Sequence, residues 1–253
     1  MRADAAQAMV ARCRVEPMAV GSGRDVPAGD LPEALRLFRG FIAAIKHNGL
    51  RKIAPLTLRL LRACNAEILF FAEIAPAYLE LRRKVALPPA ALFDHFERSL
   101  RTYLPRMGAQ ARPLVEAVLR HEASIWRAAT APRDEPVSAG PRLAPAARIE
   151  PYELDVLGLS AELARGPCDA PPAAERRRQF IFYQPEGEIT RIFEIDALSA
   201  CVLALVDGRP LEAVCGDAAK ASGFATTAMV ASLIEDAASR GMVVPGAAAS
   251  ALA

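Results

Sequence analysis

Apolar positions in the first half of the chain recur every three or four residues, the period of helices that bury one face. Residues 31–48 form the first such segment, with Asp30 as a candidate N-cap and Gly49 as the stop. Its apolar positions are Leu35, Phe38, Ile42 and Ile45. The strongly apolar stretch 56–75 follows, and we expect it to fill the middle of a helical domain.

Prolines divide the rest of this half into further helices. Pro76 is expected to kink or end the apolar stretch, after which residues 78–85 continue as a helical piece. The Pro-Pro pair at 88–89 opens the next amphipathic segment, which closes at Pro105. Residues 112–129 give one more, so the pattern predicts a bundle of five or six helices.

The second half changes to the two-residue alternation of strands. Residues 178–184 are rich in aromatic and β-branched side chains, and residues 188–195 alternate between two faces. Between them, residues 185–187 (PEG) supply turn chemistry. Residues 148–157 are a possible further strand, interrupted by Pro151.

Three short helices and a last strand are predicted after this hairpin. The helices start at the cap Asp196, at Pro210 and at Thr226, and the strand covers residues 242–244. The buried positions expected on the third helix are Met229, Val230, Leu233, Ile234, Ala237 and Ala238. This order predicts a winged-helix-like domain of three strands and three helices.

The predicted fold class is therefore α+β, an N-terminal helical bundle followed by a winged-helix-like C-terminal domain. Residues 131–147 hold four prolines and no amphipathic period, so we interpret them as an extended linker. The expected division is 1–30 disordered or extended, 31–130 helical domain for docking a partner, 131–147 linker, 148–245 winged-helix domain for peptide recognition and 246–253 flexible tail.

Composition agrees with a folded cytoplasmic protein. The chain has 253 residues, of which 53% are hydrophobic and 24% are charged, enough for a real core. Its five cysteines are an odd number without a C-x-x-C pair, which favours reduced thiols. We find no apolar run of transmembrane length and no secretory signal, so neither a membrane partner nor export is expected.

Charge is segregated along the chain although the net charge is only +2. Residues 31–130 carry 16 Lys and Arg against 8 Asp and Glu, giving +8. Residues 149–244 carry 8 against 15, giving −7. Either the two halves have different electrostatic roles, or their opposite charges help them to pack together.

No catalytic or metal-binding pattern is legible. His47, His95 and His121 lie at no ligand spacing, and Cys201 and Cys215 fall on apolar helix faces. Residues 21–23 (GSG) lack the context of a phosphate loop, and the acidic pairs at 134–135 and 235–236 are interpreted as solvated surface. We therefore assign no catalytic residue, metal ligand or cofactor to this chain.

The charge of the third helix argues against DNA binding. It offers Glu235, Asp236 and one late Arg240, whereas a recognition helix needs cations and amides for phosphates and base edges. We therefore expect a guest peptide to add to the edge of the 188–195 strand, with its apolar side chains against the third helix. The expected peptide-binding residues are Glu188, Ile189, Thr190, Arg191, Ile192, Phe193, Glu194, Ile195, Met229, Leu233, Asp236 and Arg240.

Two readings remain open around this site. The strand edge could instead be covered by the N-terminal domain. The basic run 176–178, just before the first strand, is either a solvated loop end or a contact for an acidic peptide.

Residues 182–187 (FYQPEG), 193–197 (FEIDA) and 204–210 (ALVDGRP) carry a resemblance to a known family. In this order they resemble the peptide-recognition element of ribosomal-peptide modification pathways, whose archetype is the pyrroloquinoline-quinone peptide chaperone. Here Gln184 is inserted between Tyr183 and Pro185, and Asp196 stands where the family pattern has Asn. The resemblance covers about a quarter of the chain and implies leader-peptide binding.

The helical half has a looser resemblance, carried by residues 46–51 (KHNGLR), 103–105 (YLP) and 119–123 (LRHEA). These segments look like the helical domain of partner proteins for multinuclear non-haem iron oxidases of methanobactin, thiaglutamate and related pathways. The resemblance implies an accessory subunit that forms a heterodimer with the oxidase and presents the precursor's leader to it. Iron and the chemistry on Cys would then belong to the partner.

Two hypotheses from other classes stand beside this one. The chain could be a winged-helix DNA-binding transcriptional regulator that uses its basic helical half for nucleic acid, although we expect no nucleic-acid partner. It could also be a free-standing enzyme, which stoichiometric iron or zinc on the isolated chain would support.

Overall fold

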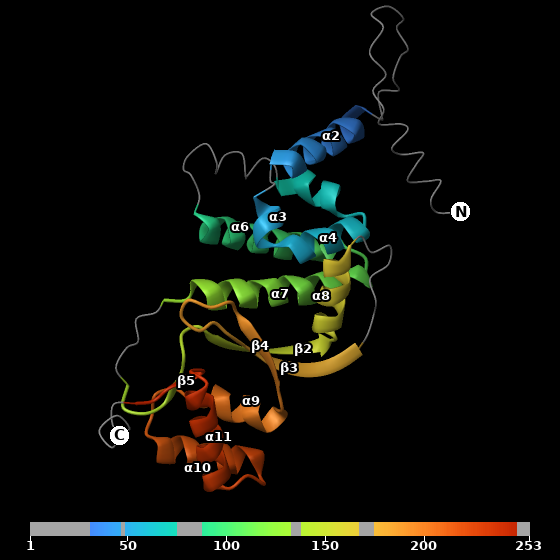
Figure 1. Cartoon of the computed structure of the whole chain (residues 1–253). Coiled ribbons are helices and arrows are strands. Elements are labelled where there is room, and N and C mark those ends of the chain that lie inside the picture. The colour runs from blue at the N-terminus through green and yellow to red at the C-terminus, as the bar shows by residue number, and fades with distance from the viewer. Residues whose placement is uncertain (1–30, 47–48, 75–87, 133–137, 167–174, 247–253) are drawn as a thin grey trace, which may run out of the picture.

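The computed structural model of the chain describes residues 31–46, 49–74, 88–132, 138–166 and 175–246 (Figure 1). Within these residues the N-terminal half is helical and the C-terminal half contains small antiparallel sheets and further helices. This is the α+β class that the sequence predicts. No helix in the described ranges has the length and apolar character needed to span a membrane.

The helical half is built from short and medium helices packed on one long helix. In chain order they are α2 (Leu31–Lys46), α3 (Leu50–Ile53), α4 (Pro55–Ala63), a helix at 67–74, α6 (Pro89–Tyr103), the 3-10 turn η1 (Leu104–Arg106) and α7 (Ala111–Thr130). The apolar stretch 56–75 is thus two helices rather than the single one predicted. Asn65, with φ of 54°, makes the break, because asparagine tolerates the left-handed conformation. The helical piece predicted at 78–85 lies outside the described residues.

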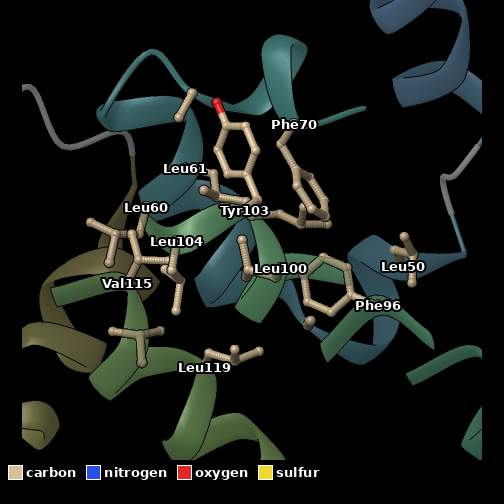
Figure 2. Packing of buried hydrophobic residues seen from close by; sticks show 14 of the residues in the cluster. Leu50, Leu60, Leu61, Phe70, Phe96, Leu100, Tyr103, Leu104, Val115 and Leu119 are labelled. Carbon is tan, nitrogen blue, oxygen red and sulfur yellow. The ribbon is translucent and has the colours of Figure 1, made fainter. Parts of the chain in front are cut away.

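Aromatic and leucine side chains fill the core of this half. Figure 2 shows the ring of Phe70 between those of Phe96 and Tyr103, at centroid distances of 5.7 and 5.5 Å. Both pairs meet edge to face, the arrangement that the charge distribution of aromatic rings favours. Leu50, Leu60, Leu61, Leu100, Leu104, Val115 and Leu119 surround them, all buried.

Buried carboxylates fasten α7 to its neighbours. Glu122 of α7 accepts hydrogen bonds from the backbone nitrogens of Leu56 and Thr57, at 2.7 and 2.9 Å, and so caps the first turn of α4. Burial raises the pKa of Glu122 in spite of these bonds. Glu97 of α6 pairs with Arg101 and with Arg127 of α7. Burial alone would raise the pKa of Glu97, but the hydrogen bonds from the two arginines hold it below its ordinary value.

A three-stranded antiparallel sheet lies in the C-terminal half, in the order β2 (Ala147–Leu154), β3 (Glu175–Tyr183) and β4 (Arg191–Ile195). β2 runs through Pro151, which pairs with Gln179, so proline does not interrupt it as predicted. The position is tolerated because β2 is an edge strand. β3 begins at Glu175 and takes in the basic run 176–178, which therefore lies within the strand rather than before it.

The terminal strand does not join this sheet. β5 (Val243–Val244) pairs instead with β1 (Arg142–Leu143), which lies inside the segment predicted as a linker. The third strand beside the β3–β4 hairpin is β2, contrary to the strand set that the sequence predicts. β1 was not predicted, because its pairing partner lies about a hundred residues away, beyond the reach of local patterns.

An unpredicted helix, α8 (Val156–Arg165), separates β2 from β3. Asp155 caps it by accepting a hydrogen bond from Gly158 N at 3.1 Å. Its buried Leu159 and Leu163 join the core of the helical half. Arg59 of α4 donates to the carbonyl of Leu163 at 2.7 Å, near the end of the helix. α8 thus ties the sheet region to the bundle.

The sheet lies between α7 on one side and three helices on the other (Figure 1). These helices are α9 (Ala197–Ala204), α10 (Leu211–Ser222) and α11 (Thr227–Ser239). Phe180 and Phe182 pack toward α7 with Tyr152, whereas Ile181 belongs to the cluster formed with α9, α10 and α11. Among the described residues no ion pair joins the helical half to the sheet and its three helices, so opposite charges do not hold the junction through direct pairs.

Candidate functional site

The site predicted from the sequence centres on β4, and β4 is an edge strand. The sheet order places β3 on one side of it, with pairs from Gln179↔Ile195 to Tyr183↔Arg191. No strand in the described part of the chain pairs with its other side. Because alternate residues of an antiparallel strand direct their N–H and C=O groups away from the partner, this side of β4 presents a short row of donors and acceptors that no strand of the described residues pairs.

The strand is shorter than predicted, because its first three residues belong to the turn. Glu188 N donates to Pro185 O at 3.3 Å, and Ile189 is 83% exposed. The Thr190 hydroxyl donates to Gln184 Oε1 at 2.7 Å across the turn. Both hydrogen bonds lie within the turn, and residues 188–190 are outside the ladder that they were expected to extend.

The side chains of β4 divide between the two faces of the sheet. Phe193 and Ile195 pack, half-buried, with the cluster formed by α9, α10 and α11. Ile192 packs on the opposite face with the α7 cluster, beside the exposed Glu194. A peptide strand added to this edge would therefore find apolar neighbours for its own side chains on both faces.

The predicted residues of α11 share one stripe of that helix. Met229, Leu233, Asp236 and Arg240 follow the i, i+4, i+7, i+11 spacing. Leu233 is half-buried in the same apolar cluster as Phe193 and Ile195. Met229 is 50% exposed and outside that cluster, so its prediction as a buried position is wrong.

One end of α11 lies against the β3–β4 hairpin. A Cβ on Gly241, just after the helix, would lie 2.5 Å from the hydroxyl oxygen of Tyr183, so Tyr183 packs directly over this glycine. Tyr183 is paired with Arg191, the first residue of β4. The contact brings the Arg240 end of the stripe to the beginning of the edge strand. Gly241 has φ of 75°, which favours glycine there.

Charged side chains around the edge are paired with one another. Arg191 pairs with Glu188, and Arg178 of β3 pairs with Glu194. Arg240 donates to Asp236 at 3.0 Å on α11. These pairs leave the edge without a strong local field of either sign, which suits a largely apolar guest better than a highly charged one.

Burial is the main influence on the pKa of both histidines of the described residues. His121 is only 3% exposed, and its ring meets those of Phe182 and Tyr152 at 5.4 and 6.4 Å. Burial lowers its pKa to about 4. Burial also lowers the pKa of His95, and Arg98 adds to the effect. His47 lies outside the described residues, as do the acidic pair 134–135 and the segment 21–23.

The described residues include Cys64, Cys201 and Cys215, of which Cys201 and Cys215 are free thiols. Burial, with Glu212 nearby, raises the pKa of Cys215, which keeps the thiol protonated and a poor nucleophile. In the same residues no group of three His, Cys, Asp or Glu side chains has a geometry able to hold a metal ion.

Sequence reasoning missed a polar cluster where α7 meets the sheet. The guanidinium carbon of Arg120 lies 4.5 Å from the centre of the Tyr152 ring, and Tyr152 is 1% exposed. Burial raises the pKa of this tyrosine. The signal for this cluster in the sequence was the alternation Ile149-Glu150-Pro151-Tyr152, which is typical of a strand. It was missed because Pro151 was interpreted as an interruption of the strand. The cluster is internal and joins the two halves.

The sequence matches no protein-family model and no curated protein.

Proposed function

We propose that the chain is a non-catalytic accessory subunit that binds the leader region of a ribosomally made precursor peptide. The leader adds as a strand to the outer edge of β4, and the chain presents it to an iron-dependent oxidase that modifies Cys. The observation that carries the proposal is that β4 is an edge strand with apolar side chains on both faces. The proposed role of the chain as the partner of an oxidase is based on the family resemblances of its two halves.

Backbone pairing alone would bind such a peptide weakly. Each hydrogen bond contributes only about 0.5–1.5 kcal/mol net, and β4 has five residues. Selectivity must therefore come from side-chain contacts with Phe193, Ile195 and the stripe of α11. In the proposed arrangement, residues 188–190 lie beside the first residue of β4 and do not pair with the peptide.

A winged-helix DNA-binding regulator is supported less well by the charges of α11. Its exposed side carries Glu235 and Asp236, and Arg240 is engaged by Asp236. A DNA duplex would meet carboxylates where recognition needs cations. Duplex DNA titrated at two salt concentrations is therefore the natural control for peptide binding.

The test uses two proline variants at neighbouring positions, Arg191→Pro and Ile192→Pro. One of these two residues directs its N–H outward and the other directs it toward β3. The variant that loses the outward N–H should stay folded by circular dichroism and bind the leader peptide at least roughly tenfold more weakly in calorimetric titration. The other variant should lose stability instead.

The full experiment adds the oxidase produced in the same pathway, assayed with the complete chain by gel filtration. We expect the chain and the oxidase to form a heterodimer, and we expect substitutions in β4 to weaken binding of the leader peptide. If both proline variants are folded and bind the leader peptide as tightly as the wild type does, the leader does not bind at the outer edge of β4. Failure of the wild type to bind either the oxidase or the leader would contradict the function as a whole.

A further inference from the structure

Helix α2 places small residues inward and large apolar residues outward. A Cβ on Gly40 would lie 2.3 Å from the carbonyl oxygen of Ile68 and 3.0 Å from Ala72, so the helices touch at this point. Ala43 and Ala44 are buried on the same side. The outward residues are Leu35, Phe38, Phe41 and Ile45, which are 46%, 61%, 53% and 58% exposed. We name these four residues the α2 stripe.

The inner side already fixes α2 to the bundle without the α2 stripe. Arg36 reaches Glu73 of the helix 67–74 at 3.2 Å and Glu33 of its own helix at 3.6 Å. Glu73 also pairs with Arg106. The large apolar residues are thus not needed to hold the helix. If the four large residues of the α2 stripe served only to pack α2 on the bundle, we would expect them at the inner positions, which Gly40, Ala43 and Ala44 occupy instead.

We propose that the α2 stripe is a docking surface for a different protein, which receives α2 in an apolar groove bordered by acidic side chains. Phe38, Phe41 and Ile45 follow the i, i+3, i+7 spacing by which an amphipathic helix is recognised in an apolar groove. This inference rests on the proposed function, which requires a companion enzyme, and it identifies the surface that the enzyme contacts.

The available area argues against a second copy of the chain as the occupant. An aromatic side chain contributes on the order of 150–250 Å² when fully buried, and we take the lower part of this range for the leucine and isoleucine of the stripe. The four residues of the stripe, each about half exposed, thus offer roughly 400 Å². Two stripes facing each other would bury roughly 800 Å², below the roughly 1,200–2,000 Å² of stable interfaces. A groove that also covers the flanks of the helix can exceed this area.

Charge supports the same choice of occupant. Residues 31–130 carry a net charge of +8, so two copies would repel each other through this half. An acidic rim on a different protein is attracted instead. The stripe also lies far from the peptide site, because α2 and the helices α9, α10 and α11 occupy opposite ends of the molecule (Figure 1).

The test compares Phe38→Asp with a matched control, Phe224→Asp. Phe224 is also an exposed phenylalanine, at 72%, but it lies in the turn between α10 and α11. Each full-length variant is titrated with the companion oxidase by biolayer interferometry and with the leader peptide by calorimetry, and sedimentation velocity gives its mass. Phe38→Asp should weaken oxidase binding at least ~30-fold, since central aromatic anchors dominate interfaces. Phe224→Asp should leave oxidase affinity unchanged, and leader binding should survive in Phe38→Asp.

Other outcomes separate this inference from the proposed function. If Phe38→Asp, folded by circular dichroism, binds the oxidase as tightly as the wild type does, the α2 stripe is not the docking surface, although the proposed function stands. A wild-type dimer that Phe38→Asp dissociates would make the occupant a second copy and overturn the inference. If the oxidase does not bind the wild type while the leader does, both the docking inference and the oxidase part of the function are overturned.

Discussion

His121 has the most perturbed environment among the histidines of the described residues. Its imidazole lies between α7 and the sheet, against Phe182 and Tyr152, with Arg120 and Glu122 as its charged chain neighbours. Burial lowers its pKa from 6.5 to about 4. The unfolded chain therefore binds a proton more readily than the folded one between these values, and the fold loses stability as the pH falls through this window.

We expect this one residue to reduce the free energy of unfolding by about 2 kcal/mol between pH 7.5 and pH 5. The measurement is urea unfolding at both pH values for the wild type and for His121→Leu, which removes the titrating group. Glu122 acts in the opposite direction, because its pKa is raised, so the informative quantity is the difference between the two proteins. If the free energy of unfolding changes equally with pH in the wild type and in His121→Leu, protonation of His121 is not the cause of the loss of stability.

Local signals account for the elements that the sequence predicts well. Asp196 was predicted as a cap and Thr226 as a helix start, and each accepts a backbone hydrogen bond at the beginning of its helix. Gly223 and Gly241 follow the ends of α10 and α11, and both have positive φ, which favours glycine. These features depend on residues only three or four positions apart, so a single sequence contains them.

Elements that depend on distant partners were predicted poorly. β1 exists because β5 pairs with it, and β2 passes through Pro151 because β3 supports it on one side. α8 was missed because its apolar residues are buried by α4 and α7 rather than by its sequence neighbours. The edge position of β4 follows from the same long-range pairing. A hairpin could be predicted from its turn, but the strand that completes the sheet could not.

The β1 region packs tightly on the loop after α9, and Gly140 is where the fit is closest. A Cβ there would lie 1.7 Å from the carbonyl oxygen of Arg209, a backbone atom that cannot move aside cheaply. Gly140→Ala should therefore lower the free energy of unfolding by about 2 kcal/mol or more. Thermal unfolding of the full chain measures it.

Gly216 of α10 supplies the matched control for that substitution. A Cβ at Gly216 meets nothing within 4 Å, and alanine favours helix over glycine. Gly216→Ala should stabilise the protein by about 0.5–1 kcal/mol. Equal effects of the two substitutions would mean that the 138–147 region does not pack as described.

Within the described residues the two halves meet at a mainly apolar junction, to which Arg120 adds its contact with the Tyr152 ring, and no ion pair crosses it. Phe180 of β3 is fully buried there, with its ring 5.9 Å from that of Tyr152. Ala117 and Ala128 of α7 and Val156 of α8 complete the cluster. We therefore expect the two halves of the wild-type protein to unfold together.

Phe180→Ala should destabilise the protein by about 3–5 kcal/mol and uncouple the halves. The single tryptophan, Trp126, stacks on Phe93 in the helical half, so its fluorescence reports on that half. Far-ultraviolet circular dichroism reports on both halves. The two transitions should coincide in the wild type and separate in Phe180→Ala. Coincident transitions in the variant would show that the junction does not couple the halves.

The central claim is that a guest peptide pairs with the free side of β4. Residue-resolved amide hydrogen exchange of the complete chain, with and without the leader peptide, tests it most directly. We predict that binding slows exchange at alternate amides within Arg191–Ile195, because only outward N–H groups gain partners. Saturating peptide that leaves β4 exchange unchanged while protecting another surface would contradict the claim.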